Sequence, residues 1–400
     1  MMSHSIVYTA DSISGLRAWS SKAGRELLAS SSLTSGGESP RFPVSMAIDA
    51  SERTGGTERV ALGFEDGSFS VYALREVQVR LDSLYTHPTS TNGMLSAIAY
   101  SSPYLLTMTE DHLLSLYAFP ETTNMYDALE DPRLLHSLRS NTVWPPLSLS
   151  LRTTTLSMTA AIAYSLPTYL SGWTVGVQEL LLTHQGDLLQ SRLATAADEH
   201  SFTLSEYRSV PAASAGRLYS FPECARDGDS TSGPSRSKPT SMSYSHPYLL
   251  VAHPDNTLSL YLVRSTSSTL SINPGSRLWG HTSSISGAYV GMRGKAVSVS
   301  RLGDELRIWD LEGGMASSAT RKRSRHGDLS VRIQPWKMSG DDDVRDEHLA
   351  TRRHGLRFAL DQGCDDSTVS HGWVGFDEQT VVVLREKSEG SQALVVYDFS

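Results

Sequence analysis

Cysteine is scarce in this sequence, because only Cys224 and Cys364 occur among its 400 residues. They stand far apart in polar stretches, so a disulfide framework is not expected and a reducing compartment is. Apolar runs long enough to cross a bilayer are also missing, since such a span needs about 20 residues. The first residues, MMSHSIVYTADS, lack the basic and then apolar pattern of a secretory signal. These absences predict an intracellular protein that is cytoplasmic, nuclear or both, without a membrane partner.

Positive charge is not in excess either. The 35 Lys and Arg residues are outnumbered by 43 Asp and Glu residues, and the formal net charge is −8. This balance gives no electrostatic footprint for nucleic acid, so no nucleic-acid partner is expected. Helical patterns are rare as well, because apolar residues mostly alternate or form short runs bounded by Gly, Pro, Ser and Asp. The sequence therefore predicts an all-β protein.

One segment returns along the chain. DGSFSVYAL, DHLLSLYAF and DNTLSLYLV begin at Asp66, Asp111 and Asp255, and each has a tyrosine six residues after the aspartate. Each follows another strand-like run, which indicates a hairpin with a tight polar turn. A further run stands before and another after most copies, and four short strands per unit are the blade of a β-propeller. We expect the three aspartates to be structural residues that bond to turn amides in three different blades.

Seven units can be counted by their third strands, which predicts a seven-bladed β-propeller with four-stranded blades over residues 1–400. The unit at about 156–207 is weak, and its third strand is expected near Leu193. Three segments cannot bury enough apolar surface to fold and are expected to be disordered inserts: 222–241, the basic segment 312–328 and the charged segment 339–355. RKRSRH at 321–326 is a nuclear localisation signal, a polyanion-binding patch or a solvated loop.

One unit resembles a WD repeat. Residues 280–311, GHTSSISGAYVGMRGKAVSVSRLGDELRIWDL, start with Gly-His and end with Trp-Asp before a leucine. In WD repeats a His, a turn Asp, a strand Ser or Thr and the Trp form a hydrogen-bonded network, and the resemblance gives these roles to His281, Asp304, Ser300 and Trp309. The other units lack the Gly-His pair and mostly carry tyrosine, so the WD pattern is strong in this unit alone.

The tail WVGFDEQTVVVLREKSEGSQALVVYDF is similar to the C-terminal part of fungal F-box/WD-repeat proteins. In that family an F-box precedes the propeller and binds the Skp-type adaptor of a cullin ubiquitin ligase. The sequence contains no F-box-like helical stretch, and its first and last units supply three strands each, so we expect that upstream sequence is lacking. A Skp-type adaptor is a partner only if that upstream sequence carries an F-box.

Motifs for catalysis or cofactor binding are weak. Gly294-Lys295 lacks the glycine that a P-loop needs, and the 13 histidines form no cluster with zinc spacing. GDSTSG at 228–233 has no strand-to-helix turn to expose its serine. No metal, cofactor or catalytic residue is therefore expected, and the turn aspartates of different blades do not form a carboxylate pair.

These patterns predict a non-enzymatic propeller that binds proteins. The resemblance to F-box/WD-repeat proteins implies that it is the substrate-recognition module of an SCF-type F-box ubiquitin ligase in ubiquitin-dependent degradation. If the substrate is phosphorylated, Arg301, at the end of a strand, is the candidate contact, because arginine binds phosphate through paired hydrogen bonds. A solvated arginine at that position is the alternative. A WD-repeat scaffold of an unrelated assembly, in trafficking or RNA processing, is the rival function, and a propeller enzyme would need converging acids, histidines or a metal cluster.

Overall fold

The structure is a computed structural model that describes most of the chain. The described residues are 1–3, 6–21, 26–33, 41–51, 58–75, 79–120, 128–140, 143–168, 172–196, 237–291, 294–300, 305–311, 330–333, 367–368, 374–376, 380–387 and 392–398. All of the secondary-structure elements in these residues are β-strands, which confirms the all-β prediction. Most of the predicted inserts 222–241, 312–328 and 339–355 lie outside the described residues.

Three sheets come from the first part of the chain. The first contains β1 (Met2–Ser3), β2 (Ile6–Asp11), β3 (Gly15–Ser20) and β4 (Leu27–Ser31). The second contains β5 (Pro43–Ile48), β6 (Arg59–Phe64), β7 (Phe69–Arg75) and β8 (Arg80–Thr86). The third contains β9 (Leu95–Ser101), β10 (Tyr104–Thr109), β11 (Leu113–Ala118) and β12 (Arg133–Arg139). In each sheet, strands that follow one another in the chain pair antiparallel, so the order in the sheet is the order in the sequence.

Three more sheets follow the same plan. One contains β13 (Trp144–Thr153), β14 (Met158–Pro167), β15 (Trp173–Leu182) and β16 (Leu188–Thr195). The next contains β17 (Ser241–Ser245), β18 (Tyr248–Ala252) and β19 (Leu258–Ser265), and β19 pairs along its length with both β20 (Leu270–Ile272) and β21 (Ser276–Leu278). The third contains β22 (Ile285–Val290), β23 (Lys295–Ser300), β24 (Leu306–Asp310) and β25 (Ser330–Ile333).

The remaining described strands form a narrower sheet. It contains β26 (Ser367–Thr368), β27 (Val374–Phe376), β28 (Thr380–Lys387) and β29 (Gln392–Asp398). Residues 381–383 of β28 pair with β27 as well as β29, and Glu386 pairs with strands β26 and β29 in the same way. Because β29 occupies one edge of β28, both β26 and β27 lie along its other edge. The sheet is therefore three strands across. The described residues therefore form six four-stranded blades, and the prediction of seven was wrong.

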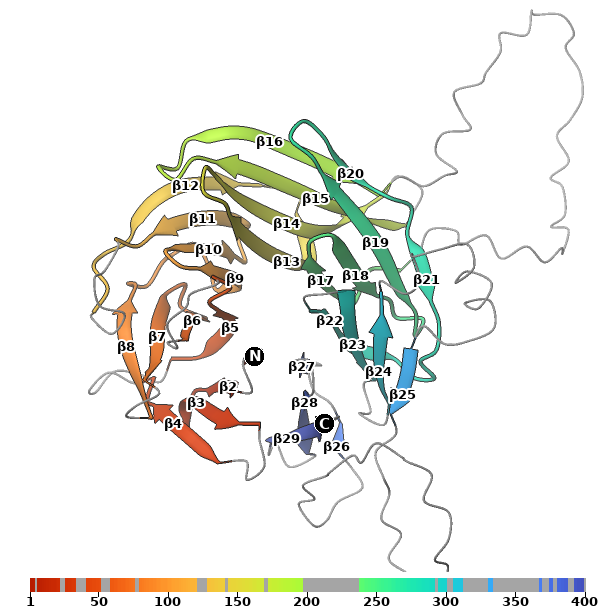
Figure 1. Ribbon diagram of the computed structural model, residues 1–400, viewed down its shortest axis with the longest axis horizontal. Coiled ribbons are helices and arrows are strands. Elements are labelled where there is room, and N and C mark those ends of the chain that lie inside the picture. Colours follow the sequence, from red (N-terminus) through yellow and green to blue (C-terminus); the bar gives the residue numbers. More distant parts are fainter. Residues whose placement is uncertain are drawn as a thin grey trace, which may run out of the picture.

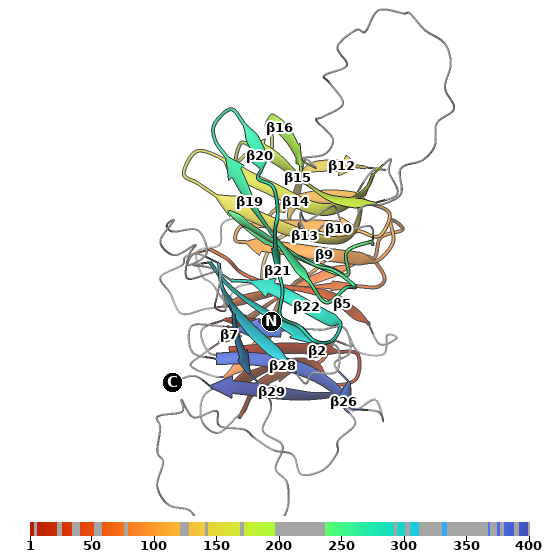
Figure 2. The ribbon, with the colours of Figure 1, turned by 90° about the vertical axis from the view of Figure 1, so that its right-hand side faces the viewer.

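The sheets are arranged as a ring around a central channel (Figure 1). The first strands β5, β9, β13, β17 and β22 face the channel, and fourth strands such as β8 and β16 form the rim. The side view shows that β2, of the first sheet, lies beside β28 and β29 of the last (Figure 2). The ring is therefore closed by sheets from opposite ends of the described chain.

The hydrophobic core lies between neighbouring sheets. The cluster between β9–β12 and β13–β16 includes Leu106, Met108, Met158 and Ile162, all essentially without solvent exposure. Burying one such side chain stabilises a fold by about 1.5–3 kcal/mol. Period-2 alternation explains the arrangement, because one side of each strand faces the preceding sheet and the other side faces the next. The ring is thus held by apolar contacts between blades.

Polar contacts also cross between blades. The Glu179 carboxylate on β15 is fully buried and accepts hydrogen bonds from Arg152 (2.6 Å), Arg192 (2.9 Å) and the hydroxyl of Ser265 (2.6 Å). Arg152 and Arg192 belong to β13 and β16 of the same blade, whereas Ser265 belongs to β19 of the next. A buried carboxylate is tolerated when charged partners bind it on several sides. This network ties the two blades together.

Serine side chains cap the free inner edges of the blades. The hydroxyl of Ser148 on β13 accepts from the Tyr244 amide on β17 at 3.1 Å, and Ser243 accepts from the Val290 amide on β22 at 3.1 Å. Ser45 on β5 donates to the Leu95 carbonyl on β9 at 2.7 Å. Backbone groups that no neighbouring strand binds are satisfied in this way.

Two boundaries differ from the sequence prediction. The weak unit starts with β13, so Leu193 lies in the fourth strand of its blade and β15 is the third. The insert 222–241 was drawn too long, because Ser241 begins β17 and the Thr240 amide donates to the Ala252 carbonyl at 2.9 Å. The insert ends earlier than predicted because its Pro-, Ser- and Thr-rich end leads into an inner strand.

Candidate protein-interaction surface

The topology divides the ring into two faces. Because consecutive strands are antiparallel, the turn between the second and third strands of a blade lies on the same face as the loop that enters the next blade. Hydrogen bonds between these segments show that they lie on one face. The Ser90 amide, in the loop before β9, donates to the Asp66 carbonyl at 3.1 Å. The Thr282 amide, in the loop before β22, donates to the Glu305 carboxylate at 2.9 Å. We call this the Asp-turn face, after Asp66, Asp111 and Asp255; the other is the opposite face.

The three repeated aspartates lie in turns between second and third strands, namely β6–β7, β10–β11 and β18–β19. Asp66 accepts from the Ser68 amide at 3.0 Å, and Asp255 accepts from the Thr257 amide at 3.3 Å and its hydroxyl at 2.6 Å. The turn of Asp111 differs, because Thr109 there caps the Leu113 amide at 3.1 Å. Two of the aspartates thus organise their turns directly, and Asp111 is an exposed acid.

Acidic residues of this face are paired with arginines. The ion pairs join Asp11 to Arg17 (2.7 Å), Asp66 to Arg41 (3.9 Å), Asp111 to Arg139 (3.8 Å), Asp255 to Arg277 (2.9 Å) and Glu305 to Arg307 (2.7 Å). Burial would raise the pKa of Asp255, but the Thr257 hydrogen bonds and the Arg277 charge outweigh it, so the pKa is lowered. An anionic partner would have to compete with these carboxylates for the arginines.

The blade β22–β25 contains a network of the kind that the WD resemblance led us to expect, but with a different serine and a different acid. The indole N–H of Trp309 donates to Ser298 Oγ at 2.7 Å, and His281 Nε2 lies 2.6 Å from the same oxygen. Trp309 is only 2% exposed. The serine of the network is therefore Ser298, whereas the Ser300 hydroxyl accepts from the Glu305 amide at 3.1 Å.

An acid also belongs to this network. Glu305 has a fully buried carboxylate that accepts from the Thr282 amide at 2.9 Å and lies 3.6 Å from His281 Nδ1. Burial would raise the pKa of Glu305, but the Thr282 amide and Arg307 hold it below its ordinary value. Asp304, to which the resemblance gave this role, and Arg301 lie outside the described residues, so the structure places neither.

The central channel has a volume of about 990 Å³. Its wall combines apolar side chains of the inner strands, such as Val44, Leu149 and Val290, with polar ones such as Tyr244 and Tyr289. A void of this size, open to solvent, admits side chains or a short peptide segment. The channel mouth on the Asp-turn face is bordered by the start of β5.

Exposed apolar side chains differ between the two faces. The exposed aromatic residues of the described chain, Phe42 (52%), Trp144 (45%) and Trp279 (67%), all lie on the Asp-turn face at the starts of blades. Leu156, in the turn β13–β14, and Leu189, at the start of β16, belong to the opposite face and are also exposed. Trp and Arg are enriched at protein interfaces, whereas Leu is under-represented among their hot spots. The Asp-turn face therefore has the composition of a binding surface.

Among the described residues, no group of three or more His, Cys, Asp or Glu side chains is arranged to hold a metal ion. The same part of the chain has no helix long and apolar enough to cross a membrane.

Four-stranded blades around a channel, one of them held by a His–Ser–Trp network, define a WD-repeat β-propeller. The chain belongs to the family described as the F-box protein pof12 beta-propeller, whose model matches residues 1–400. No curated protein matches the chain.

The chain is similar to several solved propellers at low sequence identity. The C-terminal WD40 domain of Sif2 is 12% identical, with a TM-score of 0.44 over 99% of this chain and 79% of that one. The WD40 beta propeller domain of Doa1 is 11% identical, with a TM-score of 0.45 over 99% and 90%. Saccharomyces cerevisiae Sqt1 is 13% identical, with a TM-score of 0.43 over 99% and 82%.

Proposed function

We propose that this propeller is a non-enzymatic protein-binding module that recognises substrates for an SCF-type F-box ubiquitin ligase. The observation that carries this proposal is the match of the whole chain to a propeller family of F-box proteins. In such a ligase the propeller supplies the substrate contact, and an F-box supplies the contact to the Skp-type adaptor. Nothing in this role requires a metal or a cofactor.

The Asp-turn face is the proposed substrate-binding surface. It carries the exposed aromatic residues and a series of arginines, which are the residue types that dominate interface energetics. A ring of packed sheets holds these loops and turns in place, so that a partner is bound without large loss of entropy in the propeller. The structural residues of the blades, such as Trp309 and His281, keep that scaffold rigid.

Arg301 is proposed as the contact to a phosphorylated substrate. In sequence it follows β23 directly and precedes β24, so it belongs to a connection of the kind that forms the Asp-turn face. Arg301→Ala should weaken binding of a phosphorylated substrate peptide by about ten- to a hundredfold, since a charge-assisted bond contributes about 1.5–3 kcal/mol. Arg301→Lys should restore only part, because lysine lacks the planar fork. Equal affinity for phosphorylated and unphosphorylated peptides would exclude phosphate recognition.

The proposed ligase role is tested by purifying the full-length protein, expressed from its own gene, from its native cells. The expected result is recovery of a Skp-type adaptor and a cullin, together with a substrate whose lifetime increases when the gene is deleted. Recovery of a different assembly, without adaptor or cullin and with unchanged lifetimes, would overturn the ligase role. It would assign the propeller to a scaffold in trafficking or RNA processing.

A further inference from the structure

Four exposed acidic residues stand in two neighbouring turns of the Asp-turn face. Glu65 and Asp66 stand in the turn β6–β7, and Glu110 and Asp111 stand in the turn β10–β11. The loop between β8 and β9 joins the two turns, because the Ser90 amide donates to the Asp66 carbonyl at 3.1 Å and the Glu110 amide donates to a carbonyl of the same loop at 2.8 Å. We call these four residues the acidic rim.

The two turns are separated by little more than one glycine. A Cβ placed on Gly67 would lie 2.9 Å from the Gly93 carbonyl, and one placed on Gly93 would lie 3.6 Å from the Asp111 carboxyl carbon. Both glycines have positive φ angles, +76° and +81°, which favour glycine at these positions. This close approach brings the carboxylates of two blades onto one continuous surface.

Nearby arginines compensate the acidic rim only in part. Arg41 is 13% exposed, lies 3.9 Å from Asp66, donates to two serines and stacks over the Phe64 ring at 3.8 Å, so its orientation is fixed by the blade. Arg139 is 57% exposed and lies 3.8 Å from Asp111, so solvent screens the attraction between the two charges. Four carboxylates against two guanidinium groups leave an excess of negative charge.

An apolar surface borders the acidic rim on the channel side. Phe42 is 52% exposed and its carbonyl accepts from the Glu65 amide at 3.0 Å, which joins the two residues directly. Pro43 and Val44 follow it into the channel wall, and Val44 is 42% exposed. The channel mouth therefore offers an apolar contact immediately beside unbalanced negative charge.

We propose that this part of the channel mouth binds a segment of the partner in which an apolar residue is flanked by lysine or arginine. The apolar residue contacts Phe42 and Val44, and the basic side chains lie over the acidic rim. A second copy of the chain is disfavoured, because its own rim would meet like charge and the chain has a formal net charge of −8. An acidic segment is repelled here for the same reason. The inference rests on the proposed substrate-binding role and names the charge of the segment bound at these two blades.

The test is a selection of random 12-residue peptides, displayed on phage, against the full-length protein. Lysine or arginine adjacent to one apolar residue should be enriched among the selected peptides. Synthetic copies should bind the Glu65→Lys/Glu110→Lys protein about tenfold or more weakly, and added salt should weaken binding to the original protein. Both glutamates are exposed and lie in turns, so the variant should fold.

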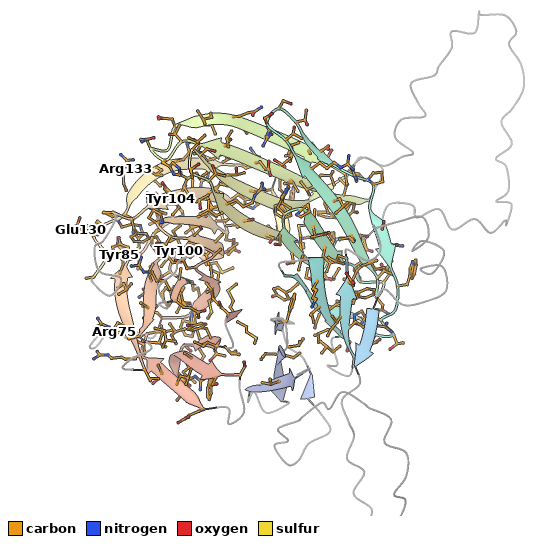
Figure 3. The ribbon with its side chains drawn as sticks, in the orientation of Figure 1. Arg75, Tyr85, Tyr100, Tyr104, Glu130 and Arg133 are labelled. Atoms are coloured by element: carbon orange, nitrogen blue, oxygen red, sulfur yellow. The ribbon has the colours of Figure 1, made fainter. Side chains whose placement is uncertain are left out.

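The matched control is Glu26→Lys/Glu130→Lys, which changes the net charge equally on the opposite face. Glu26 precedes β4 and Glu130 precedes β12, and Glu130 is seen on the outer rim of the ring (Figure 3). The control should bind the selected peptides within about twofold of the original. Phe42→Ser should weaken binding about tenfold and leave its salt dependence unchanged.

Several outcomes would overturn the inference. These are selection of acidic or uncharged peptides, failure to select any, equal losses in the rim and control variants, or self-association that the rim variant abolishes. None of them decides the ligase role, which depends on recovery of the adaptor and the cullin. Conversely, loss of the ligase role leaves the charge preference of the channel mouth measurable.

Discussion

Two neighbouring blades each contain a buried histidine in contact with a strand serine, but the histidine comes from a different position in each blade. In β17–β21, His253 Nε2 lies 2.9 Å from Ser259 Oγ, and the histidine comes from the turn after β18. In β22–β25, His281 Nε2 lies 2.6 Å from Ser298 Oγ, and the histidine comes from the loop before the first strand. Each histidine is buried, at 4% and 8% exposure. Both blades therefore contain a buried imidazole in hydrogen-bond contact with the hydroxyl of a strand serine.

The two blades differ in how deeply the acid and the aromatic residue are buried. Glu305 has no exposed side-chain surface, whereas the Asp255 side chain is 44% exposed. Trp309 is buried and bonded to Ser298, whereas Tyr261 is partly exposed. Buried polar networks contribute more when fully satisfied, since the low dielectric strengthens each bond. The blade with the WD pattern should therefore lose more stability when its residues are changed.

The largest effect is expected for Trp309→Ala. Removing a buried indole should lower the free energy of unfolding by about 3–5 kcal/mol, because a cavity forms and the Ser298 bond is lost. Tyr261→Ala in the neighbouring blade should cost less, since that side chain is partly exposed. Urea denaturation of the two variants makes the comparison, and a smaller loss for Trp309→Ala than for Tyr261→Ala would reverse it.

Low pH is expected to destabilise the protein through the blade β17–β21. Burial lowers the pKa of His253 to about 4 from an ordinary value near 6.5, with Asp255 opposing and Arg277 adding to the shift. Between these values the unfolded chain binds the proton and the folded chain does not. Stability is therefore present above pH 6.5 and is lost as the pH falls toward 4, by about 3 kcal/mol over the whole range.

The measurement is urea denaturation at pH values between 7.5 and 4.5, for the original protein and for His253→Gln. Glutamine retains a polar group near Ser259 but does not titrate, so the variant should lose less stability between pH 6.5 and 4.5 than the original. Equal slopes in that range would remove His253 as the source.

A smaller effect is expected for Ser298→Ala. The hydroxyl serves both His281 and Trp309, so its removal should cost about 1–3 kcal/mol by leaving buried polar groups without this partner. Ser259→Ala should cost less, because the Ser259 hydroxyl has a single such contact to His253. Thermal and urea unfolding of both variants test the order, and equal losses would show that the Trp309 bond adds nothing.

The smallest effect is expected for Arg277→Ala. Its ion pair with Asp255 at 2.9 Å is partly exposed, at 19% for Arg277 and 44% for Asp255, and exposed pairs contribute about 0–1 kcal/mol. The loss should shrink further in 1 M salt. A loss above about 2 kcal/mol, insensitive to salt, would mean that this pair is as important to its blade as the buried Glu305 and Arg307 pair is to the next.

Much of the fold was visible in the sequence because strand pairs and polar turns leave local patterns. The turns of Asp66, Asp111 and Asp255 were placed correctly between second and third strands. The strand β13 was missed because its Trp-Pro-Pro start suggests a loop, although those residues lie at a bulge in the pairing with β14. The last unit was expected to supply three strands, and its sheet is three strands across, but the sequence did not show that the short strand β26 lies on the same edge of β28 as β27.

His281 and Trp309 of the polar network were named from the sequence, but the position of its serine was not. Ser298 and Ser300 are two residues apart on one strand, so both point to the same side and alternation does not distinguish them. The register decides, because Trp309 pairs with Ala296 and its indole reaches Ser298 rather than Ser300. The acidic rim was missed for a related reason: its four carboxylates come from two blades, and only the packing around Gly93 brings them together.

The central claim is that a protein substrate binds the Asp-turn face. Hydrogen–deuterium exchange of the full-length protein, alone and bound to the substrate recovered with the adaptor, tests it most directly. We predict slower exchange on binding in the turns 65–68 and 110–112 and in the loop 279–284, with no change in the opposite-face turns 154–157 and 183–187. Protection of the opposite face, with the Asp-turn face unchanged, would contradict the claim.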